Sequence, residues 1–78
     1  MDVRLPQWGM DMTEGTILQW YKSVGDRVTE GEPLAEVETS KVTAELEAPV
    51  SGILSQLVAA VGDVAQVFDL VAVITEDA

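Results

Sequence analysis

The segment Gly15–Thr39 reads GTILQWYKSVGDRVTEGEPLAEVET, and the segment Gly52–Glu76 reads GILSQLVAAVGDVAQVFDLVAVITE. The second is an imperfect copy of the first at a constant offset of 37 positions. The sharpest part of the match is the Val-Gly-Asp triplet, which occurs at residues 24–26 and again at 61–63. Two copies predict two similar half-domains that share one core, because a stacked solenoid needs about three repeats or more.

Both copies are built from short runs of β-branched and apolar residues separated by turn residues. These runs predict strands over Thr16–Tyr21, Leu34–Glu38, Val42–Glu47, Ile53–Val58 and Val71–Thr75. Val42, Ala44 and Leu46 alternate with polar residues, so we expect these three to face the core. Four glycines are predicted structural turn positions: Gly25, Gly31, Gly52 and Gly62. Because no segment has a helical stripe, the chain is predicted to be a small all-β barrel or sandwich.

The composition limits the chemistry that the chain can perform by itself. Its 78 residues fit one domain, 1–78. It has no cysteine and no histidine, so it lacks protein thiols, the commonest general base and the commonest metal ligand. We therefore predict no catalytic residue and no metal site.

The charge and hydropathy pattern argue against two classes of partner. The net charge is −10, and the four basic residues are Arg4, Lys22, Arg27 and Lys41. A nucleic-acid backbone would be repelled, so no nucleic acid is expected. Apolar runs such as Leu70–Ile74 are far too short to cross a membrane. The first residues have no secretory or transit character, so we expect a cytoplasmic protein without a membrane partner.

Lys41 occupies the centre of the repeat. The turn Glu38-Thr39-Ser40-Lys41 lies between two predicted strands, which places the Lys41 side chain at a hairpin tip in water. Under the 37-residue offset, residues 38–41 correspond to 75–78, and Val42 and Thr43 correspond to Leu5 and Pro6. A pseudo-two-fold axis would then put the chain ends opposite Lys41, so that a tether leaving Ala78 presents this lysine outward. The same local sequence would also suit an ordinary exposed turn lysine, so the turn alone does not show that Lys41 has a function.

A family pattern runs through nearly the whole chain. It comprises residues 5–15 (LPQWGMDMTEG), Trp20, Val24-Gly25-Asp26, Gly31, Glu38-Thr39-Ser40-Lys41-Val42, Pro49 and Gly52. In this order and spacing the chain resembles the lipoyl domains of 2-oxo acid dehydrogenase complexes, and Trp8-Gly9 resembles the acetoin-type or pyruvate-type acyltransferases. The resemblance implies a flattened barrel of two four-stranded antiparallel sheets with pseudo-two-fold symmetry, in which lipoate is attached to Lys41.

The resemblance also implies partners and a longer chain. A lipoate ligase or lipoyl transferase would attach the cofactor, and a thiamine diphosphate-dependent decarboxylase would reductively acylate it. The acyl group would pass to coenzyme A on a separate catalytic domain, and dihydrolipoyl dehydrogenase would reoxidise the dithiol. The chain would be the N-terminal domain of an acyltransferase and not an enzyme in isolation. The residues expected to contribute to the attachment turn and partner recognition are Glu38, Thr39, Ser40, Val42 and Trp8.

Two positions depart from the family pattern. Ser40 stands where the family usually has aspartate, which changes the charge beside Lys41. Phe68 stands where glycine is expected opposite Gly31, and we expect its ring to pack against the barrel.

Three other kinds of protein share part of the pattern. A biotin carrier domain has the same fold but usually flanks the lysine with methionines, unlike Ser40 and Val42. The lipoyl carrier protein of glycine cleavage is longer and has a helical extension. An unmodified interaction module is the third alternative. Lys22 has Ala59 as its counterpart, outside a turn, and is expected to stay unmodified.

Overall fold

A computed structural model of the chain describes residues 1–76, which form eight strands. The strands are β1 (Asp2–Arg4), β2 (Glu14–Trp20), β3 (Arg27–Val28), β4 (Pro33–Glu38), β5 (Thr43–Glu47), β6 (Gly52–Leu57), β7 (Val64–Gln66) and β8 (Leu70–Glu76). The five predicted strands lie within a residue or two of β2, β4, β5, β6 and β8. The sequence pattern missed β1, β3 and β7, which are two or three residues long and too short to show a period.

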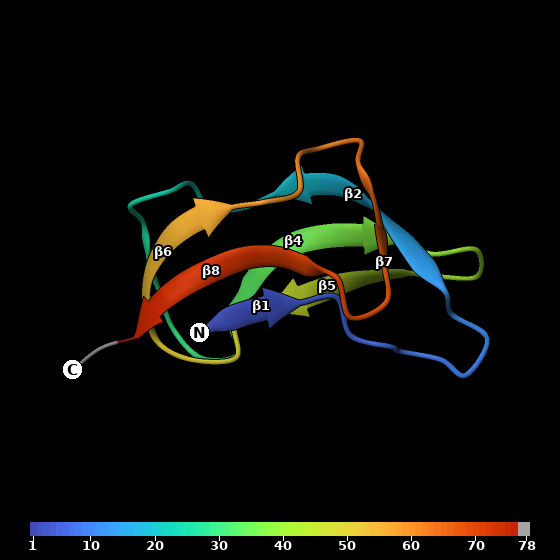
Figure 1. Cartoon of the computed structure of the whole chain (residues 1–78), viewed down its shortest axis with the longest axis horizontal. Coiled ribbons are helices and arrows are strands. Elements are labelled where there is room, and N and C mark those ends of the chain that lie inside the picture. Colours follow the sequence, from blue (N-terminus) through green and yellow to red (C-terminus); the bar gives the residue numbers. More distant parts are fainter. Residues whose placement is uncertain (77–78) are drawn as a thin grey trace.

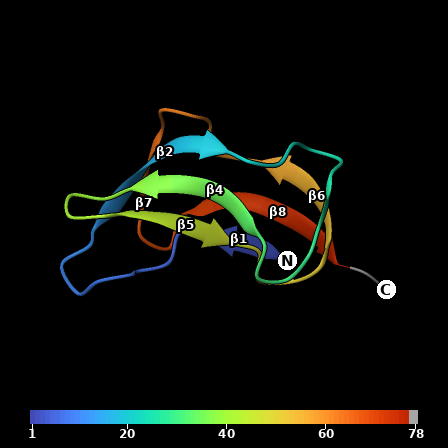
Figure 2. The same ribbon diagram turned by 180° about the vertical axis from the view of Figure 1, so that it is seen from behind.

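The strands form two antiparallel four-stranded sheets that face each other. One sheet has the order β1-β8-β6-β3 and the other has the order β5-β4-β2-β7. Figures 1 and 2 show the two sheets from opposite sides as the layers of a flattened, elongated molecule, and its principal extents are 37 × 21 × 17 Å. The predicted all-β fold of two four-stranded sheets is therefore confirmed.

The repeat in the sequence is a repeat in the structure. Strands β2, β3 and β4 correspond to β6, β7 and β8 at the 37-residue offset. The two halves also exchange equivalent backbone hydrogen bonds: the Gly25 N–H donates to the Leu54 carbonyl at 2.7 Å, and the Gly62 N–H donates to the Ile17 carbonyl at 2.7 Å. Because each half supplies donors to the other, neither half has its backbone satisfied alone.

The offset changes at the remaining pair of strands, which corrects one prediction. Val3 pairs with Ala72, and Leu46 pairs with the equivalent Ala35, so β1 corresponds to β5 at a separation of 43 positions. Residues 42 and 43 are therefore not the counterparts of residues 5 and 6. The 37-residue offset does not continue past the β4–β5 turn. This turn has no covalent counterpart in the other half, because the chain ends lie there.

The predicted placement of the chain ends holds for the residues that the structure describes. The β4–β5 hairpin forms one end of the long axis, at the right of Figure 1, while the start of β1 and the end of β8 lie toward the other end. Glu76 is the last residue of β8. Residues Asp77 and Ala78, from which we expected a tether to leave, lie outside the described part of the chain.

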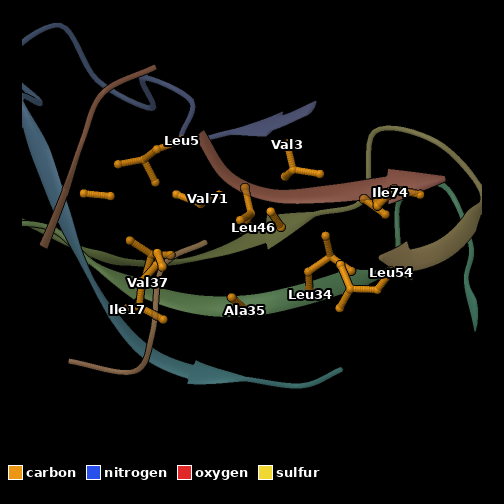
Figure 3. Packing of buried hydrophobic residues seen from close by; sticks show 14 of the residues in the cluster. Val3, Leu5, Ile17, Leu34, Ala35, Val37, Leu46, Leu54, Val71 and Ile74 are labelled. Carbon is orange, nitrogen blue, oxygen red and sulfur yellow. The ribbon is translucent and has the colours of Figure 1, made fainter. Parts of the chain in front are cut away.

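A single apolar core fills the space between the sheets (Figure 3). Among the described residues it contains no buried polar or charged side chain. The fully buried larger side chains come from both sheets and from β1's continuation: Leu5, Ile17, Leu34, Leu54, Ile74, Val3, Val28, Val37 and Val71. Burial of each such side chain stabilises the fold by about 1.5–3 kcal/mol before the entropy cost. This core holds the hairpin strands rigidly at their inner ends.

Three residues differ from the sequence prediction in their burial or their role. Leu46 is buried, but Val42 is 57% exposed because it belongs to the turn and not to β5. Gly52 lies inside β6, where a side chain would meet the Thr75 carbonyl oxygen, so its role is close strand approach and not a turn. Phe68 is 61% exposed and therefore does not pack against the barrel.

Gly25, Gly31 and Gly62 are confirmed as turn residues. Their φ angles are +97°, +86° and +91°, a region that side chains resist. Phe68, at the position equivalent to Gly31, has φ of +70°. The chain therefore keeps a glycine-type turn with a phenylalanine in it.

Candidate functional site

The β4–β5 hairpin is closed by the backbone and side chain of Thr39. Strand pairing continues to Glu38 opposite Thr43, and the Thr39 N–H then donates to the Val42 carbonyl at 2.8 Å. The Thr39 hydroxyl donates to that carbonyl at 2.9 Å and accepts from the N–H groups of Lys41 at 3.3 Å and Val42 at 3.1 Å. Threonine suits this role because its hydroxyl can replace a backbone partner in a turn. The turn that carries Lys41 is thus held by three bonds to one side chain.

Lys41 projects from this turn into solvent. Its side chain is 71% exposed, and its Nζ lies 3.0 Å from Asp11 Oδ2. Asp11 is itself 82% exposed, and ion pairs between exposed side chains contribute at most about 1 kcal/mol. The amine is therefore guided toward the β1–β2 loop but remains reachable by another molecule.

The β1–β2 loop lies beside the hairpin, as both views show (Figures 1 and 2). Its shape is set by internal bonds: the Met12 N–H donates to the Gly9 carbonyl at 3.0 Å, and the Gln7 amide donates to the Met12 carbonyl at 3.2 Å. Trp8 is 38% exposed in this loop and is not part of the buried core.

A pocket of about 210 Å³ separates this loop from the hairpin. It is lined by Trp8, Gly9, Met10, Asp11, Met12, Thr39, Ser40, Lys41 and Val42. Four of the five residues predicted for the attachment turn and recognition line this pocket beside Lys41. Glu38 instead lines the neighbouring groove together with Thr39 and Ser40. The sequence alone assigns no role to Asp11, Met10 or Met12. A linear pattern does not show which loop residue contacts a lysine about thirty positions away.

The second lysine is placed differently. Lys22 Nζ lies 3.1 Å from Glu32 Oε2, and the Lys22 side chain is only 26% exposed. The backbone N–H of Thr29 and then Lys22 hold the pKa of the Glu32 carboxyl below its usual value. Because this ion pair is partly sheltered, Lys22 is less accessible to an acylating enzyme than Lys41.

Negative charge gathers on the outer face of the hairpin strands. Glu36 and Glu45 stand directly opposite each other in the β4–β5 register. Partial burial, and then these two carboxylates, raise the pKa of the Tyr21 hydroxyl, which is also hydrogen-bonded to Glu45. The two strands that carry the Lys41 turn are therefore acidic on this face.

Within residues 1–76, no group of three or more His, Cys, Asp or Glu side chains comes together in a way that could hold a metal ion. The described residues form no helix that is long and apolar enough to cross a membrane.

The residues present fit a prosthetic group joined to Lys41 by an amide bond. The amine is exposed, stands at a rigid tip and is paired only with an exposed carboxylate among the contacts that the structure describes. The exposed apolar side chains of Trp8, Met10 and Val42 line the pocket beside Lys41. They offer a surface compatible with an aliphatic arm.

Known proteins share both the sequence and the shape of this chain. A family model described as "Biotin-requiring enzyme" matches residues 1–74. The acetyltransferase component of the pyruvate dehydrogenase complex of Corynebacterium glutamicum is 46% identical over 72 residues, which are 92% of this chain and 11% of that protein. The succinyltransferase component of the 2-oxoglutarate dehydrogenase complex of Bacillus subtilis is 42% identical over 99% of this chain and 18% of that protein.

Two further relatives widen the comparison. The acetyltransferase component of the acetoin cleaving system of Pseudomonas putida is 40% identical over 92% of this chain and 20% of that protein. The solution structure of the lipoyl domain of the 2-oxoglutarate dehydrogenase complex of Azotobacter vinelandii superposes with a TM-score of 0.80 at 28% identity, covering 100% of this chain and 99% of that one. The chain spans a fifth or less of the three curated relatives.

An all-β domain with this hairpin and these relatives is a carrier domain. The chain belongs to the biotinyl and lipoyl domain family. It is similar to a lipoyl domain of known structure and to parts of dihydrolipoyllysine acyltransferases.

Proposed function

We propose that this domain carries a lipoyl group on Lys41 and moves acyl groups within a 2-oxo acid or acetoin dehydrogenase complex. The single observation that supports this most strongly is the position of Lys41: its amine is exposed at a hairpin tip, at the end of the molecule away from Glu76. A carrier needs its reactive group displayed outward and its tether at the other end.

Attachment requires that Lys41 Nζ attack an activated lipoate carboxyl. The ammonium first loses one proton to become a nucleophilic amine. The amide bond then forms as the activating group leaves the carboxyl carbon and the nitrogen loses a second proton, a step catalysed by a lipoate ligase or transferase. Thr39 would hold the turn fixed while this happens, since its hydroxyl bonds the Lys41 N–H. Asp11 would direct the amine toward one side of the tip.

The cofactor would supply a dithiolane. The decarboxylated substrate on thiamine diphosphate would provide the electron pair that reduces the disulfide, leaving the acyl group on one sulfur and a proton on the other. This chain would contribute presentation and recognition. Trp8, Glu38, Ser40 and Val42 surround the attachment point and are the surface that a thiamine diphosphate-dependent decarboxylase would read. Coenzyme A and dihydrolipoyl dehydrogenase would complete the cycle. Tethering makes these encounters intramolecular and raises the effective concentration.

The relatives are several times longer than this chain, which supports its being one domain of an acyltransferase. In such a protein the domain would lie at residues 1–78, ahead of the catalytic part. The relatives belong to pyruvate, 2-oxoglutarate and acetoin systems, which supports a substrate within this group.

Co-expression with a ligase tests the proposal. The chain is produced with lipoate ligase and, separately, with biotin ligase, and each product is weighed intact. We expect a lipoyl-sized gain with the first enzyme, its loss in Lys41→Ala, and no gain with the second. A gain with biotin ligase alone would make this a biotin carrier, and no gain with either would leave an unmodified interaction module.

A further inference from the structure

The turn between β7 and β8 displays an aromatic ring at a conformational cost. Phe68 has φ of +70°, and it is the one non-glycine residue with positive φ in residues 1–76. Its side chain is 61% exposed. A left-handed backbone is unfavourable for a residue with a Cβ, so such outliers persist where something else maintains them.

The turn itself does not need this ring. In the other half, Gly31 occupies the same position with φ of +86°. Both turns close in the same way: the Glu32 N–H donates to the Thr29 carbonyl at 2.8 Å, and the Asp69 N–H donates to the Gln66 carbonyl at 3.0 Å. Because glycine completes the turn without a side chain, folding gives no reason for phenylalanine at position 68.

The β7–β8 turn, which contains Phe68, lies in the half of the molecule that carries the hairpin. The Phe68 N–H donates to the Leu5 carbonyl at 2.8 Å, and the neighbouring Val67 N–H donates to the Thr13 carbonyl at 3.0 Å. Leu5 and Thr13 flank the loop whose Asp11 contacts Lys41. Figure 1 shows the β7–β8 turn, this loop and the hairpin in the same half of the molecule.

The turn carries few charges of its own, but the Arg4 guanidinium reaches it: Nη1 donates to the Phe68 carbonyl at 3.0 Å, and Nη2 pairs with Asp2 at 3.2 Å. Residues 48–75 contain two charged side chains, Asp63 and Asp69. Both carboxylates already accept a backbone N–H, from Ala60 at 2.9 Å and Gln66 at 3.0 Å. Val64, at the start of β7, is 52% exposed. An exposed phenylalanine beside an arginine fits a pocket on a protein partner, because aromatic residues and arginine dominate affinity at such contacts.

We propose that Phe68 is the anchor by which the decarboxylase that acylates the lipoyl group on Lys41 holds this domain. This inference rests on the proposed function. The choice of the decarboxylase over the ligase follows from geometry. A ligase reacts at Lys41 Nζ and must enclose the hairpin tip, whereas acylation occurs at the far end of the lipoyl arm. The decarboxylase can therefore contact the β7–β8 turn in addition to the residues around the tip.

Two substitutions separate the ring from the backbone strain. Phe68→Ala removes the ring and keeps a Cβ in the strained turn, whereas Phe68→Gly removes both. Val24→Ala is the matched control, because Val24 is 58% exposed and lies in the β2–β3 connection toward the other end of the molecule. All four chains are lipoylated first, and the modification is verified by intact mass.

Each chain is then offered, with its 2-oxo acid or acetoin, to the decarboxylase components of the C. glutamicum, B. subtilis and P. putida systems. The one that acylates the wild type serves for the series. We expect both Phe68 variants to raise the KM for the domain about tenfold with kcat unchanged, and Val24→Ala to match the wild type. Phe68→Gly should melt a few degrees above Phe68→Ala. The lipoylation rate and the turnover of free lipoamide should not change.

Wild-type acylation kinetics in both Phe68 variants would overturn this inference, and so would an equal loss in the lipoylation rate, which would make Phe68 a ligase contact. Failure of the wild type to be lipoylated or to be acylated by any of the three enzymes would instead overturn the proposed function, and this inference with it.

Discussion

Alanine substitutions at Gly52 and Gly25 should destabilise the domain for different reasons and by different amounts. At Gly25, φ is +97° and no atom lies within 4 Å of the position that a Cβ would take. The cost there is conformational, about 1 kcal/mol. At Gly52 the φ is ordinary for a strand, but a Cβ would meet the Thr75 carbonyl oxygen and come within 3.0 Å of the Glu76 Cα. Backbone atoms cannot rotate away, so β6 and β8 must separate.

Overpacking of this kind costs about 1–3 kcal/mol and sometimes more. The cost at Gly52 should lie at the upper end, because β6 pairs with β8 over five residue pairs from Gly52 to Leu57. A domain of this size has a total stability of about 4–12 kcal/mol, and 1 kcal/mol shifts Tm by about 4–8 °C. We therefore expect Gly25→Ala to lower Tm by about 4–8 °C and Gly52→Ala by about 12 °C or more.

Thermal unfolding followed by circular dichroism, with urea titration as a second probe, measures both shifts. An unchanged Tm in Gly52→Ala would refute the close strand approach. A larger loss in Gly25→Ala than in Gly52→Ala would refute the ranking of steric blockage above backbone conformation.

Three further outcomes follow from the charged groups. Lys41→Ala should shift Tm by no more than a few degrees, because its exposed pair with Asp11 contributes at most about 1 kcal/mol; a large loss on thermal scanning would contradict this. The lowered pKa of Glu32 means that its stabilisation is present above the ordinary value of 4.5 and is lost as pH falls through the folded-state pKa. As the pH is lowered, the Tm of Glu32→Gln should therefore fall less than the Tm of the wild type. Parallel plots of Tm against pH for the two proteins would contradict this prediction. The raised pKa of Tyr21 means that its contribution is present below the ordinary value of 10.0 and is lost as pH rises through the folded-state pKa; absorbance titration should show a lower tyrosine pKa in Glu45→Gln, and an unmoved titration would exclude the carboxylate's influence.

The architecture could be predicted from the sequence because the repeat is strong where strands are long. The Val-Gly-Asp triplets mark equivalent turns, and Gly25 and Gly62 make equivalent hydrogen bonds across the halves. Strand β1 could not be placed correctly, since its relation to β5 depends on pairing with β8 and not on the 37-residue offset. The repeat does not show which strand pairs with β1, because the two chain ends interrupt the second copy.

The site was predicted less completely than the fold. Lys41 and Thr39 occupy one hairpin and could be related by position alone. The Asp11 contact could not be predicted, because it joins the hairpin to a loop whose path is set by its own hydrogen bonds. Phe68 was expected to pack inward from its size, but the turn geometry directs it to solvent. The apolar side chain favours burial, but the hydrogen bonds of the turn fix a backbone conformation that leaves it exposed.

Mapping of the modified residue tests the central claim most directly. The chain is treated with lipoate ligase, lipoate and ATP, cut with a protease, and sequenced by fragment-ion mass spectrometry, with Lys41→Arg as the matched control that keeps the positive charge. We predict that the lipoyl group is found on Lys41 and not on Lys22 or the N-terminal amine, and that Lys41→Arg stays unmodified. A lipoyl group on Lys22, or undiminished modification of Lys41→Arg, would contradict the assignment of the hairpin tip as the carrier site.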